Sequence, residues 1–263
     1  MAKTLFLGDF DAQFSIFRKN IAPILTGVDR VVSLGSLISC GEGIKDRKDS
    51  GRNNAILQMW DEISIAKQKL LGPTEILALN FPEEWTNHAS NTYLRDGWLS
   101  KSPNYQVALE VNGKLASHGG LTYGEWVALG RPSTAGEAAQ KLNEKYARTL
   151  FQGPCFRLSG AANPSANPIW ADAITELYPS WLYALENCPF DQIVGGESLN
   201  NERASNLKNN PDSPIAHLDE IVYTPYGSLA TLRSFRIIAV DYDLGSEIQT
   251  TFRKDRSLYV EES

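Results

Sequence analysis

Short apolar runs alternate with longer segments of helical periodicity in the first third of the chain. Residues 4–7 (TLFL) and 30–34 (RVVSL) are short, mainly apolar runs, which are typical of buried strands. Residues 13–25 and 54–71 carry apolar side chains at helical spacing, and the run EILALN at 75–80 predicts a third strand. This order of strands and helices predicts a parallel α/β sheet with right-handed crossovers.

The second part of the chain changes character. YQVALEVNGKLASHGG, residues 105–120, reads as two strands joined by Asn112-Gly113, a dipeptide typical of tight hairpin turns. Residues 133–151 predict a capped helix. Three further predictions are a short helix at 174–185 interrupted by Pro179, a strand followed by a turn at 190–198, and two strands within 227–243.

Composition restricts the class of protein. The 263 residues suit one domain, which we take as 1–263 with a core of 1–250 and a C-terminal tail of 251–263. A net charge of −6 argues against direct nucleic-acid binding, which needs a basic surface. Three scattered cysteines form no disulfide framework, so we expect a cytoplasmic protein. No apolar stretch is long enough for a membrane span or a signal peptide.

Candidate chemistry begins where the first predicted strand ends. Asp9 and Asp11 are two residues apart, so in an extended segment their carboxylates face the same side and suit a cation such as Mg²⁺, Mn²⁺ or Fe. Both could instead cap the helix that follows. Because ligands of open α/β sheets bind outside the carboxyl ends of the strands, the strand-ending turns should meet at one edge.

These turns carry a resemblance to a known family. In order they are GDFDA at residues 8–12, LGSLISCGEG at 34–43, LALNFPEEW at 77–85, ASHGGLTYGEW at 116–126 and DQIVGGES at 191–198. The series resembles the metal-binding motifs of calcineurin-like metallophosphoesterases, in particular their bacteriophage-encoded members. The resemblance implies an α/β fold, a four-layer α-β-β-α sandwich, with a two-metal site at the strand ends.

The resemblance also implies a degenerate site. Asp9, Asn80 and His118 match ligand positions of that family, and Asp11 replaces a histidine. Four further positions depart from the pattern, and they are Ser36, Phe81, Gly196 and Ser198. Glu197 could add one oxygen. We therefore expect no cofactor or a single divalent cation, Mn²⁺, Mg²⁺ or Fe, because too few donors remain to hold two. Asn87-His88 is an alternative to Asn80 as the third motif.

We expect a catalytically degenerate protein that acts as a binding or regulatory module, and we assign no catalytic residue. The resemblance implies a protein partner, with a DNA-bound recombinase as one candidate, which would make the chain a recombination directionality factor for a serine integrase. The alternative is a residual metal-dependent phosphatase, phosphodiesterase or nuclease.

Aromatic residues gather between positions 170 and 183. Trp170, Tyr178, Trp181 and Tyr183 lie close together in the sequence. They are either core residues or anchors of a surface that docks a protein, since Trp and Tyr are favoured at such surfaces.

Overall fold

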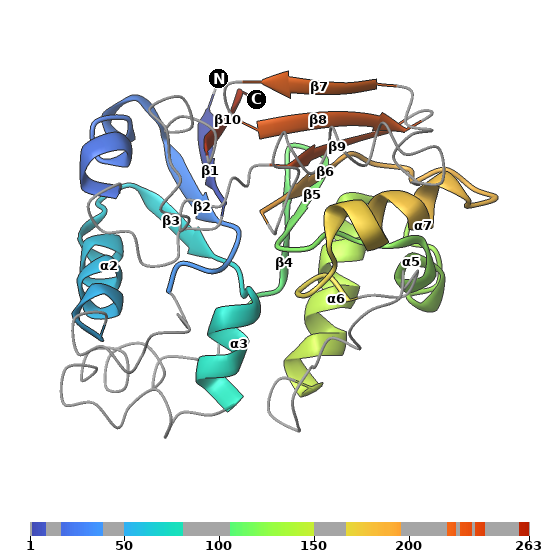
Figure 1. Ribbon diagram of the computed structural model, residues 1–263, viewed down its shortest axis with the longest axis horizontal. Coiled ribbons are helices and arrows are strands. Elements are labelled where there is room, and N and C mark those ends of the chain that lie inside the picture. The colour runs from blue at the N-terminus through green and yellow to red at the C-terminus, as the bar shows by residue number, and fades with distance from the viewer. Residues whose placement is uncertain are drawn as a thin grey trace.

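The chain folds into two β-sheets with helices beside them (Figure 1). The computed structural model describes residues 2–8, 17–38, 50–80, 106–149, 167–195, 220–224, 227–232, 235–239 and 258–262. Within these residues one sheet has four strands in the order β10-β1-β2-β3, and the other has six in the order β4-β5-β6-β9-β8-β7.

The four-stranded sheet has a parallel centre. Strands β1 (Lys3–Leu7), β2 (Arg30–Ser33) and β3 (Ala66–Lys69) run parallel, with Thr4 opposite Arg30 and Arg30 opposite Ala66. Strand β10 (Leu258–Glu262) pairs antiparallel with β1. This strand lies within residues 251–263, the predicted C-terminal tail, so that segment contributes a strand to the sheet formed by β1, β2 and β3.

Helix α2 (Ser50–Glu62) and two short helices, η1 (Phe17–Ile21) and η2 (Leu25–Gly27), accompany this sheet. Alternate residues of β1, Leu5 and Leu7, belong to one buried cluster with Ile56 and Trp60 of α2. The burial of this apolar surface, at about 25 cal/mol per Å², holds the helix against the sheet.

The six-stranded sheet begins with the predicted hairpin. Asn112 and Gly113 both have positive φ, 50° and 75°, as expected for a tight turn between two strands. The strands of this sheet are β4 (Ala108–Val111), β5 (Lys114–Ser117), β6 (Gln192–Val194), β7 (Glu220–Thr224), β8 (Gly227–Leu232) and β9 (Phe235–Ala239).

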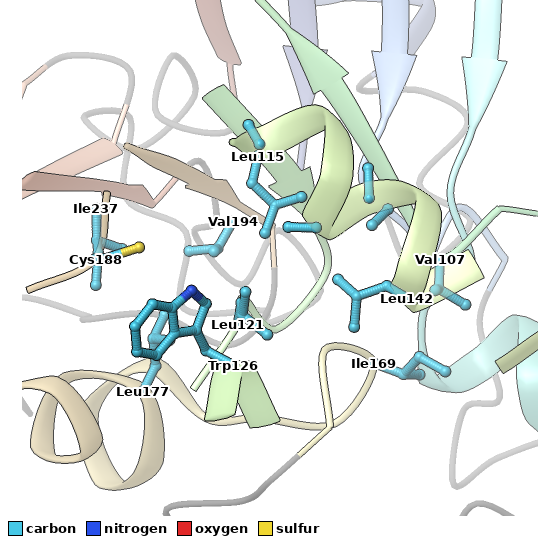
Figure 2. Packing of buried hydrophobic residues seen from close by; sticks show 14 of the residues in the cluster. Val107, Leu115, Leu121, Trp126, Leu142, Ile169, Leu177, Cys188, Val194 and Ile237 are labelled. Carbon is cyan, nitrogen blue, oxygen red and sulfur yellow. The ribbon is translucent and has the colours of Figure 1, made fainter. Parts of the chain in front are cut away.

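Several helical segments of the described residues pack beside the six-stranded sheet, and Figure 2 shows part of the cluster that joins them to it. Leu115, Val194 and Ile237 of the sheet share this cluster with Trp126 and Leu142 of the helices. The segments are α5 (Tyr123–Ala128), α6 (Ala135–Thr149), the π-helix η6 (Ala173–Leu177) and α7 (Tyr178–Leu182).

A third buried cluster combines residues of both sheets. Phe6 and Val32 come from β1 and β2, whereas Val111, Ala116 and Ile193 come from β4, β5 and β6. Phe6 lies between Leu5 and Leu7 in the sequence, and side chains of a strand alternate between its two faces. One face of β1 therefore belongs to the helical cluster and the other to the cluster shared by the two sheets.

Two predictions for the first third of the chain are wrong. Residues 75–80 form the end of helix α3 (Pro73–Asn80) and are not a strand. Residues 54–71 are not one helix, because α2 ends at Glu62 and residues 66–69 form β3. The short apolar run EILALN is compatible with a strand and with a helix. The sequence AKQK of β3 is mostly polar, which suits a strand that is only half-buried but gives no strand pattern. Pairing with β2 supplies the hydrogen bonds of this strand.

The other described elements follow the sequence more closely. The strands predicted at 4–7, 30–34 and 190–198, the hairpin, the helix at 133–151 and the two strands within 227–243 are confirmed. The helix predicted at 13–25 is reduced to η1 and η2 in its described part. The mixed α/β class is confirmed. Among the described helices, none combines the length and apolarity that crossing a membrane requires.

Candidate functional site

The ends of several parallel strands meet at one point, as the strand order predicted. The carbonyl oxygen of Leu34, just after β2, lies 3.2 Å from Nδ1 of His118, just after β5. The N–H of Gly195, just after β6, donates to the carbonyl oxygen of His118 at 2.9 Å. The turns after β2, β5 and β6 therefore form one cluster, which we call the strand-end edge.

The turns at this edge are packed without space for a further side chain. A Cβ on Gly35 would lie 2.6 Å from the backbone nitrogen of Gly72 and 2.9 Å from Nδ1 of His118. A Cβ on Gly72 would likewise lie 2.6 Å from the backbone nitrogen of Ser36. Gly195 abuts the side chain of Leu34 in the same way. Because real Cβ atoms do not approach other atoms so closely, glycine is required at these points.

A buried carboxylate closes the edge between the second and third strands. Glu75 belongs to the first turn of α3 and is only 2% exposed. Its Oε2 accepts N–H bonds from Ser36 at 2.7 Å and from Gly72 at 3.0 Å, and its Oε1 accepts the N–H of Leu37 at 2.7 Å. The N–H of Ile38 lies 3.4 Å from Oε1. The carboxylate thus ties two turns that are far apart in the sequence.

Burial and hydrogen bonding act in opposite directions on this carboxyl. Burial raises the pKa of Glu75, because a low-dielectric environment disfavours the charged form. The N–H bonds from Ser36, Gly72 and Ile38 act to lower the pKa. Among the described residues none forms an ion pair with Glu75, and the groups that face its carboxylate there are backbone N–H groups and the hydroxyl of Thr74.

His118 is held neutral at the same edge. The ring is 4% exposed, and burial lowers its pKa to about 4, while the bond to Leu34 has a smaller opposing effect. A carbonyl oxygen can only accept, so Nδ1 carries the proton and Nε2 carries the lone pair. At neutral pH this imidazole has no proton to spare as a general acid, but Nε2 is in the state that a metal ligand needs.

The structure brings together only some of the predicted site residues. Ser36 and His118 lie at the strand-end edge, both buried. Asn80 is the last residue of α3 and does not end a strand, and the position of its side chain lies outside what the structure describes. The remaining predicted positions lie outside the described residues, and they are Asp9, Asp11, Phe81, Asn87, His88, Gly196, Glu197 and Ser198.

The described residues by themselves do not form a metal site. No group of three or more His, Cys, Asp or Glu side chains is placed to hold an ion in the described ranges. His118 supplies one nitrogen, and both oxygens of Glu75 are already used by backbone N–H groups. A single-cation site built from Asp9, Asp11, Asn80 and His118, with Glu197 as a further oxygen donor, stays a prediction.

Sequence reasoning missed Gly72 and Glu75. The third strand ends at Lys69, so the segment at this edge is Leu71 and Gly72 with the first turn of α3, rather than the segment around Asn80. The signal was present, because Gly72-Pro73 followed two residues later by Glu75 suits a helix start with proline at its first position and an acidic first turn. The helix predicted over residues 54–71 ends just before Gly72 and the predicted strand begins at Glu75, so the sequence pattern conceals this turn.

Comparison with known proteins gives distant likenesses only. No protein-family model matches the chain, and no curated protein sequence matches it. A cold-active protein-tyrosine phosphatase of a psychrophilic Shewanella species shares 15% identity with a TM-score of 0.40, over 65% of this chain and 57% of the other. Another structure of a cold-active protein-tyrosine phosphatase shares 13% identity with a TM-score of 0.42, over 99% of this chain and 73% of the other.

These findings contradict the resemblance to calcineurin-like metallophosphoesterases. The solved structures that the chain resembles are described as protein-tyrosine phosphatases, and no metallophosphoesterase family model matches. The neighbours are phosphatases, but the chain spans little more than half of the first of them, and TM-scores below 0.5 carry no argument about shared activity. The site must therefore be interpreted from its own geometry.

Proposed function

We propose that this chain is a degenerate phosphatase-like protein that does not catalyse phosphate transfer and acts by binding a protein partner. The observation that carries the proposal is the carboxylate of Glu75, which occupies the N–H groups of Ser36, Leu37 and Gly72. Those donors are what a phosphate would need at this edge, and a buried carboxylate beside them repels a second anion.

The neutral groups around Glu75 support the same proposal. Phosphoryl transfer depends on positioned positive charge and donors around the transferring group. Ser36 offers a neutral hydroxyl, and His118 is uncharged at neutral pH because burial lowers its pKa to about 4. The packing of Gly35 against Gly72 and His118 leaves no room there for a phosphoryl group.

We also propose the finer description of the fold, in which the layers run helices, sheet, sheet, helices. Three buried clusters support it: one joins the four-stranded sheet to α2, one joins the six-stranded sheet to α5, α6 and α7, and one combines the two sheets. Figure 1 agrees, since α2 and the α5–α7 group lie on opposite sides of the molecule.

A protein is the partner that the surface favours. Tyr183 and Leu185, 68% and 94% exposed, follow α7, and the nearby Glu186 pairs with Arg131 at 3.0 Å. Exposed aromatic and aliphatic side chains next to an ion pair are common at protein interfaces. The net charge of −6 supports neither direct nucleic-acid binding nor a membrane surface as the target. We keep the cytoplasmic location as part of the proposal.

The more specific role of a recombination directionality factor is not proposed. It rested on the family resemblance that the comparisons contradict. The residual metal-dependent hydrolase stays as the second candidate, because the proton on Nδ1 of His118 leaves Nε2 able to bind a cation.

Hydrolysis with added metal separates the two candidates. We would assay an aryl phosphate and an aryl phosphodiester with Mn²⁺, using wild type, Asp9→Ala and His118→Ala, and measure bound metal in each. We expect no turnover above Mn²⁺ alone in any of the three. Turnover by wild type that is lost in both variants would establish the hydrolase, whereas turnover equal in all three would indicate a contaminating enzyme.

A further inference from the structure

The surroundings of Glu75 have the composition of an anion receptor. Its two carboxylate oxygens accept from backbone N–H groups of Ser36, Leu37, Ile38 and Gly72, at 2.7, 2.7, 3.4 and 3.0 Å. The hydroxyl of Thr74 is 3.3 Å from Oε2. All five donors are neutral. They would therefore recognise an anion by hydrogen bonds to its oxygen atoms and not by the attraction of a positive charge.

The backbone of the second turn creates this receptor. Gly35 and Ser36 have positive φ, 115° and 49°, which turns the following N–H groups out of the β-ladder. Consecutive N–H groups arranged in this way form a concave nest that binds anions. Gly72 contributes its N–H from the other turn, directly against Ser36. Buried N–H groups require an acceptor, so the nest would be costly if it were empty.

We infer that the N–H groups of Ser36, Leu37, Ile38 and Gly72 constitute an oxyanion site that the chain closes from within by the Glu75 carboxylate. The ligand class is a small carboxylate or another oxyanion with two coplanar oxygens. Donors and acceptor come from different elements, since the donors lie in two turns and the acceptor lies on α3. The site is therefore autoinhibited, and an external oxyanion binds when the carboxylate is absent.

Removal of the carboxylate gives a direct test. Glu75→Ala deletes a carboxylate and one methylene, a volume that acetate fills. We would titrate wild type and Glu75→Ala with sodium acetate, sodium phosphate and sodium chloride at equal ionic strength. The readouts are the melting temperature and the backbone amide signals of Ser36, Leu37 and Gly72 in nuclear magnetic resonance spectra.

We expect acetate to raise the melting temperature of Glu75→Ala saturably, at millimolar concentration, and to shift these amide signals over the same range. Chloride should not, and wild type should respond to none of the salts. Glu144→Ala is the matched control, because it removes an exposed carboxylate of α6 that lies outside the receptor, and it should behave as wild type. A phosphate response equal to that of acetate would extend the ligand class to phosphate, while an acetate response alone restricts it to carboxylates.

A folded Glu75→Ala that ignores both acetate and phosphate, or responds equally to chloride, overturns the inference. If Glu75→Ala does not fold in chloride, refolding should succeed in acetate, and failure in acetate also counts against it. Glu75→Gln provides the second variant: its amide nitrogen must face N–H donors, so its melting temperature should fall below that of wild type. Equal melting temperatures would show that the nest has no preference for an anion. Neither result depends on the hydrolysis assay.

Discussion

At the scale of single residues, burial decides which charges exist at the strand-end edge. His118 is neutral because removing an imidazolium from water costs more than its one bond to Leu34 returns. Burial also disfavours the charged form of Glu75, and the N–H bonds to both of its oxygens oppose this effect. Burial thus lowers the pKa of His118, so that its imidazole is neutral at pH 7, and raises the pKa of the Glu75 carboxyl.

The lowered pKa of His118 predicts acid sensitivity. The unfolded state takes up a proton near pH 6.5 and the folded state only near pH 4, so stability rises with pH across this window and is lost as pH falls through it. The difference corresponds to about 3 kcal/mol between pH 7 and pH 4. Glu75, with a raised pKa, acts in the opposite direction.

Urea unfolding at pH 7 and pH 4.5 checks this prediction. The variant His118→Gln cannot titrate but can still donate to the carbonyl of Leu34. Since all other groups are shared, wild type should lose more stability on acidification than the variant. Equal losses would mean that His118 has an ordinary pKa.

The packing of Gly35 predicts a large cost for one added methyl group. Gly35→Ala must place a Cβ against the backbone of Gly72 at positive φ, so we expect a loss of more than about 3 kcal/mol in the free energy of unfolding. In Gly27→Ala nothing lies within 4 Å of the new Cβ, and the change should stay within about 0.5 kcal/mol. Similar stabilities for the two variants in urea titrations would show that the edge is not closed.

At the scale of elements, the polar strand β3 pairs with β2 and in turn stabilises the C-terminal end of α2. Strand β3 follows α2 after three residues, and its Lys67 reaches back to the end of that helix. The ammonium Nζ donates to the carbonyl oxygens of Trp60, Asp61 and Ile63 at 2.9, 2.6 and 3.0 Å. The last carbonyls of a helix lack partners within the helix, and a cation there also complements the helix dipole.

Lys67→Met should therefore destabilise the protein by about 1–2 kcal/mol, because it removes charge-assisted hydrogen bonds and keeps the aliphatic stem. The control is Lys141→Met, which removes only the exposed pair with Glu137 on α6 and should cost less than about 0.5 kcal/mol. Chemical denaturation measures both variants. A cost for Lys67→Met no greater than the control would exclude a capping role.

The sequence predicted correctly those elements whose residue pattern is compatible with a single secondary structure. Residues 4–7 are too short and too apolar for anything but a buried strand between helices, and Asn112-Gly113 determines its turn by backbone geometry. EILALN and AKQK failed because their state depends on tertiary pairing. The first packs as a helix beyond Gly72, and the second gains its hydrogen bonds from β2.

At the scale of the whole molecule, the strand-end edge forms where segments that are distant in the sequence come together. Sequence order predicted that the turns after β2, β5 and β6 would meet, and Ser36 and His118 do lie at that edge. It could not predict that Glu75 would enter the same edge, since that carboxylate arrives on a helix that was expected to be a strand. Because residues 75–80 were predicted as a strand, the sequence did not indicate that the Glu75 carboxylate would close the site.

We propose that the chain's own carboxylate and close-packed turns leave no room for phosphate at the strand-end edge. A phosphate titration of wild type that follows the backbone amide signals of Ser36, Leu37 and Gly72 tests this proposal. We expect no saturable shift of these signals up to tens of millimolar phosphate, because their surroundings are already filled. A saturable shift confined to these residues would show an open phosphate site and contradict the proposal.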